Sequence, residues 1–142
     1  MEFNIRKIGL GDLEALSLFV QNLGESSKTF RYFESRPLTI IENHLLTVLA
    51  SNNEGEEIGY GHLDLEDGVT WLGVAVSDKH VGKGLGTAIM NFLIDYADNN
   101  GVDELKLAVD KINKSAIKLY NRTGFKVSKE LEKSILMVRN GQ

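Results

Sequence analysis

The chain has 142 residues, of which 42% are hydrophobic and 25% charged, and this length and composition predict a single globular domain over residues 1–142 rather than a disordered or fibrous chain. Its formal net charge of −4 argues against a nucleic-acid or anionic-membrane partner, and the absence of cysteine excludes disulfides, thiolate zinc sites and a cysteine nucleophile. The N-terminal residues do not resemble a signal peptide and no apolar run approaches the ~20 residues that span a bilayer, so we expect a cytoplasmic protein.

The N-terminal part is predicted to form a strand and a helix before an irregular segment. Loosely alternating apolar residues predict a strand over residues 3–8. Apolar residues at three- and four-residue spacing then predict a helix that Asp12 caps and Gly24 ends. Segment 25–36 is polar and aromatic without a clear period, and a short helix is expected from Pro37 to about residue 43.

Residues 44–77 change to a two-residue period that is interrupted by two turn signals, NNEGEE and EDG. This pattern predicts three strands joined as an antiparallel meander. Beyond this meander the expected elements are, in order, a helix ending near Gly101, a strand at 104–110, a helix at 113–123 that Gly124 ends, and strands at 125–131 and 134–139.

The predicted order of elements is β-α-α-β-β-β-α-β-α-β-β. Two strands that are connected by a helical crossover lie parallel, whereas the strands of a meander lie antiparallel. The order therefore predicts an α+β fold with a central mixed, mostly antiparallel sheet of about seven strands flanked by about four helices. A doubly wound fold is excluded because strands and helices do not alternate throughout.

A glycine-rich segment, Val81-Gly82-Lys83-Gly84-Leu85-Gly86-Thr87, joins the third strand of the meander to the following helix. Helix N-termini offer unpaired N–H groups and a partial positive charge, and glycines let the backbone approach an anion closely. We infer a phosphate or pyrophosphate site, with Lys83 adding positive potential; a ligand-free turn is the alternative. The Walker loop does not match because Gly84 follows Lys83, and the dinucleotide loop does not match because Thr87 replaces its last glycine.

A second group of residues shares one face of the helix predicted at 113–123. Asn113, Ala116, Ile117 and Tyr120 stand at spacings i, i+3, i+4 and i+7. The face has a polar group at each end and small or apolar residues between, which suits a cofactor arm lying along it. Taken singly, Asn113 is typical of a helix N-cap and Tyr120 of a half-buried core aromatic.

Together the two segments resemble the GNAT superfamily of acetyl-CoA-dependent N-acetyltransferases. Residues 81–86 are similar to its Arg/Gln-x-x-Gly-x-Gly/Ala motif, and 113–125 to its N-x-x-A-x-x-L-Y motif followed by G-F. The resemblance implies that loop amides wrap the pyrophosphate of acetyl-CoA while a strand edge pairs with the pantetheine arm. Val81 stands where the family usually has Arg or Gln, so the loop would rely on backbone amides. The implied cofactor-binding residues are Val74, Ala75, Val76, Val81, Gly82, Lys83, Gly84, Leu85, Gly86, Thr87, Asn113 and Ala116.

Acetyl transfer to an amine needs a neutral amine, stabilisation of the developing oxyanion and a proton for the leaving thiolate. The resemblance implies that Tyr120, protonated at neutral pH with an unperturbed pKa of about 10, supplies the proton and that N–H groups of residues 74–76 contact the oxyanion. Many relatives carry an acid on the strand of the pantetheine edge, but residues 69–77 contain none. His62 and Asp64 on the neighbouring strand are the candidate bases. The alternatives are a structural or substrate-contacting His62, water-mediated deprotonation, or an amine that arrives partly neutral.

The segment after the first helix is where the resemblance implies the acceptor wall. Its candidate substrate-binding residues are Phe30, Arg31, Tyr32 and Phe33. Aromatic and basic residues in alternation suit a ring with an anionic group, such as an amino sugar; an ordinary amphipathic helix is the alternative. We expect an enzyme, monomeric or homodimeric, that acetylates a primary amine of a small molecule with acetyl-CoA and no metal. A protein or peptide N-acetyltransferase and a non-catalytic acyl-CoA-binding module are the competing hypotheses.

Overall fold

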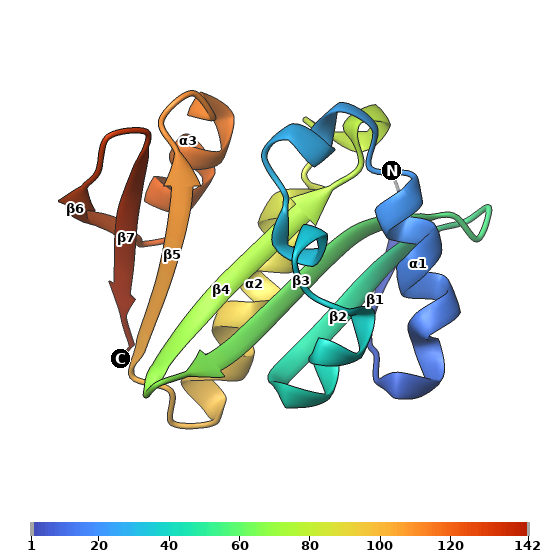
Figure 1. The fold of residues 1–142 in the computed structure, drawn as a ribbon, viewed down its shortest axis with the longest axis horizontal. Helices are drawn as coiled ribbons and strands as arrows, with labels where there is room; N and C mark the ends of the chain where they lie inside the picture. The colour runs from blue at the N-terminus through green and yellow to red at the C-terminus, as the bar shows by residue number, and fades with distance from the viewer. Residues whose placement is uncertain (1, 142) are drawn as a thin grey trace.

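The computed structural model describes residues 2–141, in which one seven-stranded sheet has the strand order β1-β2-β3-β4-β5-β7-β6 (Figure 1). Neighbouring strands are antiparallel except for β4 and β5, which are parallel. This confirms the predicted mixed, mostly antiparallel sheet. The strands are β1 (Phe3–Lys7), β2 (His44–Asn52), β3 (Glu57–Glu66), β4 (Val69–Val76), β5 (Glu104–Asp110), β6 (Lys126–Glu130) and β7 (Ser134–Asn140).

Helices cover both faces of this sheet. The α-helices are α1 (Leu13–Gln21), α2 (Leu85–Asn99) and α3 (Lys114–Arg122). The short helix expected after Pro37 is a 3-10 helix, and the segment before it, for which the sequence has no clear period, contains two more. The 3-10 helices are η1 (Leu10–Asp12), η2 (Gly24–Lys28), η3 (Tyr32–Glu34), η4 (Leu38–Asn43) and η5 (Asp78–His80).

Each face of the sheet has its own apolar core. One core joins α1 to the middle of the sheet and contains Leu16, Phe19 and Tyr60. The other core lies beneath α2 and α3 (Figure 1), and α2 contributes six buried residues at helical spacing. Burial of this apolar surface is the main favourable contribution to the stability of the fold. The buried residues of α2 are Leu85, Ile89, Met90, Leu93, Ile94 and Ala97.

Two glycines in β3 allow α2 to pack closely against the sheet. A Cβ atom on Gly59 or on Gly61 would lie 2.7 Å from side-chain atoms of Ile89. Such a distance is well below a normal van der Waals contact. The helix that follows the glycine loop is therefore held at a distance from β3 that requires glycine at both positions.

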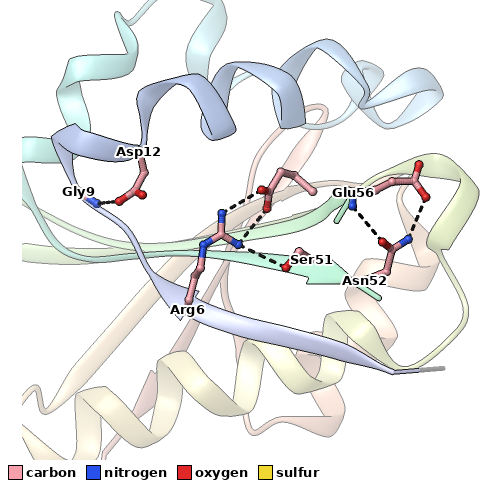
Figure 2. A network of polar contacts seen from close by, with 7 residues as sticks. Arg6, Gly9, Asp12, Ser51, Asn52 and Glu56 are labelled. Carbon is pink, nitrogen blue, oxygen red and sulfur yellow. Dashed lines mark hydrogen bonds and ion pairs between the residues drawn. The ribbon is translucent and has the colours of Figure 1, made fainter. Parts of the chain in front are cut away.

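Polar contacts fix the N-terminal edge of the sheet (Figure 2). Arg6 of β1 reaches Glu57 of β3 with two hydrogen bonds of 3.0 and 2.9 Å. The Asn52 side chain accepts two backbone N–H groups in the β2–β3 turn, both at 3.0 Å. Asp12 lies at the expected N-cap position of α1, yet its carboxylate accepts the N–H of Gly9 at 2.9 Å rather than an N–H of α1. These contacts orient β1 and the start of α1.

Candidate functional site

The sheet opens between β4 and β5. The two strands form a parallel ladder at a single pair, Trp71 with Lys106, and then separate toward their carboxyl ends (Figure 1). A cavity of about 740 Å³ lies in this opening and is lined by β4, the glycine loop, β5 and α3. Cavities of this size at the carboxyl ends of parallel strands are common ligand sites.

The edge of β4 that faces this opening carries backbone groups directed into the cavity. The N–H of Ser77 donates to the carbonyl oxygen of Ile58 in β3, at 3.0 Å. Because successive residues of a strand direct their peptide groups to opposite sides, the peptide groups of Ala75 point toward β3 while those of Val74 and Val76 point toward the opening. The hydroxyl of Ser26 donates to the carbonyl oxygen of Val76 at 2.7 Å.

The glycine loop lies at one end of the cavity, where α2 begins. Gly82 and Gly84 have positive φ angles of 76° and 85°, which glycine adopts without strain. Gly84 is the N-cap of α2 and offers no side-chain cap, so N–H groups of the first turn stay available to a ligand. The loop residues that line the cavity are Val81, Gly82, Gly84, Gly86 and Thr87. Lys83 does not line it, and Leu85 is buried in the core beneath α2.

Helix α3 forms the opposite wall. The side chain of Asn113 caps this helix by accepting the N–H of Ala116 at 3.4 Å. Ala116 and Tyr120 line the cavity from the same helix face. Tyr120 is almost completely buried, and this burial raises its pKa to about 12. Its phenol therefore carries its proton throughout the neutral and mildly alkaline range.

Tyr32, His44 and Asp64 form an ordered hydrogen-bonded chain outside the cavity lining. The hydroxyl of Tyr32 donates to Asp64 at 2.9 Å and lies 2.7 Å from Nε2 of His44. Since Tyr32 has one hydrogen and gives it to Asp64, Nε2 of His44 is the donor to the Tyr32 oxygen. Burial raises the pKa of Tyr32 and lowers the pKa of His44. This chain fastens η3 to the sheet.

His62 is buried beside this chain. Its Nδ1 lies 2.6 Å from the hydroxyl of Tyr60, and burial holds its pKa well below the usual value. Its Nε2 occupies the space next to Gly73, where a Cβ atom would approach within 2.5 Å. Gly73 lines the cavity, but neither His62 nor Asp64 does. The two candidate bases thus belong to β3, next to β4, and are not part of the cavity lining.

Of the four candidate substrate-binding residues, the structure brings two to the cavity. Phe30 and Arg31 line it, whereas Tyr32 belongs to the hydrogen-bonded chain and Phe33 packs against the α1 core. Six polar lining residues are not among the candidates taken from the sequence. They are Ser26, Thr29, Asp110, Ser115, Arg122 and Ser134.

Asp110 had a detectable signal in the sequence, because it stands three residues before Asn113 at the end of a predicted strand. The other polar lining residues carry no distinguishing pattern.

Within residues 2–141, no group of three or more His, Cys, Asp or Glu side chains is arranged to hold a metal ion. In the same part of the chain, the helices are too short or too polar to cross a membrane.

Comparison with known proteins gives consistent results. A family model described as the acetyltransferase (GNAT) family matches residues 13–125. The L-methionine sulfoximine/L-methionine sulfone acetyltransferase of Pseudomonas paraeruginosa is 30% identical over 90 residues, which are 59% of this chain and 52% of that protein. The matched stretches cover between 26% and 52% of the lengths of the curated relatives.

Solved structures share the fold over nearly all of the chain. An acetyltransferase of the GNAT family from Streptococcus pneumoniae has a TM-score of 0.84 and 20% sequence identity, covering 99% of this chain and 100% of that chain. The PaiA N-acetyltransferase of Thermoplasma acidophilum, solved in complex with coenzyme A, has a TM-score of 0.77 and 19% identity and covers 99% of both chains. These similarities confirm the predicted fold.

Proposed function

The chain belongs to the acetyltransferase (GNAT) family, and we propose that residues 1–142 act as one domain that transfers an acetyl group from acetyl-CoA to a primary amine of a small molecule. One observation carries the proposal. A single cavity is lined by the glycine loop at the start of α2, by the outward-facing edge of β4 and by Tyr120. These three features correspond to the three parts of acetyl-CoA that need recognition: the pyrophosphate, the pantetheine arm and the thioester.

The glycine loop suits the pyrophosphate. Positive φ angles at Gly82 and Gly84 expose consecutive backbone N–H groups, and the N-terminus of α2 adds a partial positive charge. The first turn of α2 holds no acidic residue that would repel an anion. The exposed Val81 side chain contributes no charge, so binding would depend on backbone amides. The coenzyme A bound to the Thermoplasma relative supports this assignment.

The edge of β4 suits the amide groups of the pantetheine arm. The peptide groups of Val74 and Val76 face the opening, and an arm with its own amides can pair with them like an added strand. The same N–H groups would donate to the oxygen of the thioester as negative charge develops on it. Ala75 would contribute no such donor, because its N–H points toward β3.

Tyr120 is the proposed general acid. Its raised pKa of about 12 keeps the phenol protonated, so it can give a proton to the departing thiolate. His62 and Asp64 are weaker candidates for the base, because neither lines the cavity. The acceptor is therefore proposed to lose its ammonium proton to water through the open side of the cavity.

The test is to follow free thiol release from acetyl-CoA with a panel of amines: amino sugars, polyamines, L-methionine sulfone and short peptides. We expect transfer to at least one small amine, confirmed by the mass of the acetylated product, and strong slowing in the Tyr120→Phe variant. Coenzyme A binding without transfer to any amine would instead indicate an acyl-CoA-binding module. Preferred acetylation of peptides would favour a protein N-acetyltransferase.

A further inference from the structure

Charged side chains in the cavity have no part in the chemistry described above. Among the described lining residues, Arg31, Asp110 and Arg122 carry a charge, and Asp110 is the one carboxylate. Alkylamines have pKa values near about 10, so an acceptor arrives as an ammonium ion at neutral pH. An ammonium ion inside a partly dry cavity requires an anionic partner. Asp110 is the side chain on the cavity wall that meets this requirement.

The backbone places Asp110 in a fixed relation to the proposed acid. Asp110 is the last residue of β5, and its carbonyl oxygen accepts the N–H of Asn113 at 3.0 Å. Asn113 caps α3, which carries Tyr120. The neighbouring Lys111 is engaged elsewhere, since its ammonium group lies 2.9 Å from Glu130. Asp110 is therefore held by a backbone hydrogen bond in the turn that leads into α3, the helix that carries Tyr120.

Arg31 holds this carboxylate only loosely. Its two guanidinium nitrogens lie 3.3 and 3.5 Å from the Asp110 oxygens, and the two side chains are 51% and 25% exposed. By contrast, the paired contacts of Arg139 with Asp98 are both 3.1 Å. Exposed ion pairs contribute little to stability, and a long one is readily exchanged for another cation.

The pair also spans the cavity. Arg31 comes from the segment between η2 and η3, on the acceptor side of β4, and also donates to the carbonyl oxygen of Lys28 in its own segment. Asp110 comes from β5 on the other side of the opening. A guanidinium group anchored to one wall thus stands in front of a carboxylate on the other wall, where an incoming ammonium group would bind.

We propose that Asp110 binds the ammonium group of the acceptor and that Arg31 occupies this position until the acceptor displaces it. The inference rests on the proposed acetyl transfer and names its acceptor class: amines that enter as cations. Binding at Asp110 would place the amine nitrogen between β5 and the edge of β4. Asp110 is then a residue that determines specificity through direct contact with the acceptor.

The experiment compares a cationic with a neutral acceptor. Spermidine is protonated at neutral pH, whereas hydroxylamine is a neutral nucleophile and needs no anionic partner. Acetyl-CoA consumption with each is measured for the parent protein and for Asp110→Asn, Asp110→Glu and Arg31→Gln, and the uncatalysed reaction of each amine with acetyl-CoA is subtracted. Glu104→Gln is the matched control, because Glu104 lies at the opposite end of the same strand, outside the cavity lining.

We expect Asp110→Asn to raise the KM for spermidine about ten- to a hundredfold, the range of a charge-assisted hydrogen bond. The KM for acetyl-CoA and the rate with hydroxylamine should stay near those of the parent, which also shows that the variant is folded. Asp110→Glu should keep part of the spermidine activity. Arg31→Gln should lower the KM for spermidine, because it removes a competing cation.

The opposite signs of the two variants distinguish this role from a structural tether. If Arg31→Gln impaired spermidine acetylation as much as Asp110→Asn did, the pair would be a tether and the proposal would be wrong. Transfer to hydroxylamine but not to spermidine by the parent protein would also overturn it while leaving acetyl transfer intact. Transfer to neither acceptor would count against the proposed function itself.

Discussion

Replacement of Tyr120 by phenylalanine measures how strongly the cavity wall favours the protonated phenol. Burial raises the pKa of Tyr120 to about 12 in the folded protein, against about 10 in an unfolded chain. The folded state therefore holds this proton more tightly than the unfolded state does. The stability that this contributes is fully present below about pH 10 and is lost as the pH rises toward 12.

The size of the loss follows from the two pKa values. At about pH 11 the ionisation of Tyr120 in the unfolded chain lowers the free energy of unfolding by about 1.4 kcal/mol, and the limit above pH 12 is about 2.7 kcal/mol. The Tyr120→Phe variant lacks this ionisation. Tyr32 and Tyr60 also have raised pKa values, but they are present in both proteins and cancel in the comparison.

Urea unfolding at several pH values between about 8 and 11, followed by the fluorescence of Trp71, provides the measurement. The stability of the parent relative to Tyr120→Phe should fall by about 1.4 kcal/mol over this interval. Equal pH dependence in the two proteins would show that the hydroxyl is solvated and would refute the reasoning.

At neutral pH the Tyr120→Phe variant should transfer acetyl groups about a hundredfold more slowly than the parent. This is near the lower end of general-acid effects, because a thiolate leaves readily.

Three other substitutions test the surroundings of the site. Gly61→Ala should destabilise the protein by about 1–3 kcal/mol, because its Cβ would lie 2.7 Å from Ile89. Gly11→Ala is the control and should be neutral, because a Cβ there has open space. The midpoints of thermal unfolding of the two variants provide the comparison. Because the pKa of His62 is lowered in the folded state, only the unfolded chain takes up its proton when the pH drops below about 6.5. The free energy of unfolding therefore falls with pH by up to about 1.4 kcal/mol per pH unit. In urea unfolding, the stability of a His62→Gln variant should fall less steeply with decreasing pH. Val81→Arg should tighten coenzyme A binding severalfold in calorimetry by adding a cation beside the glycine loop, and an unchanged affinity would argue against a pyrophosphate there.

Much of the fold could be predicted from local patterns. The Asp67-Gly68 turn between β3 and β4 has φ angles of 51° and 80°, as the Asp-Gly signal in a hairpin requires. Apolar residues with a two-residue period before the glycine loop indicated the meander, and apolar residues at helical spacing after it indicated α2. These elements are predictable because a strand or helix that buries one face needs apolar residues at its own spacing along the sequence.

The segment that contains η2 and η3 was not predicted to form helices, and the reason is physical. Its 3-10 helices are short and carry no period of their own; tertiary contacts hold them. Tyr32 is fixed by its bond to Asp64, and Phe30 packs on Tyr60 with ring centroids 5.3 Å apart. Both partners belong to β3, far away in sequence. No local sequence pattern indicates such long-range contacts. The position of the acceptor wall in the chain could therefore be predicted from the sequence, but its conformation could not.

Asp110 shows the same limit in the candidate site. In sequence its one signal is its position three residues before Asn113, and it becomes a cavity residue because β4 and β5 separate after the Trp71–Lys106 pair. The separation leaves peptide groups of Val74 and Val76 without a strand partner on that side. Backbone polar groups that lack water must find other partners, and Ser26 supplies one for the Val76 carbonyl. The remaining groups suit an amide-bearing arm of a ligand, and the same opening turns Asp110 and Tyr120 toward one space.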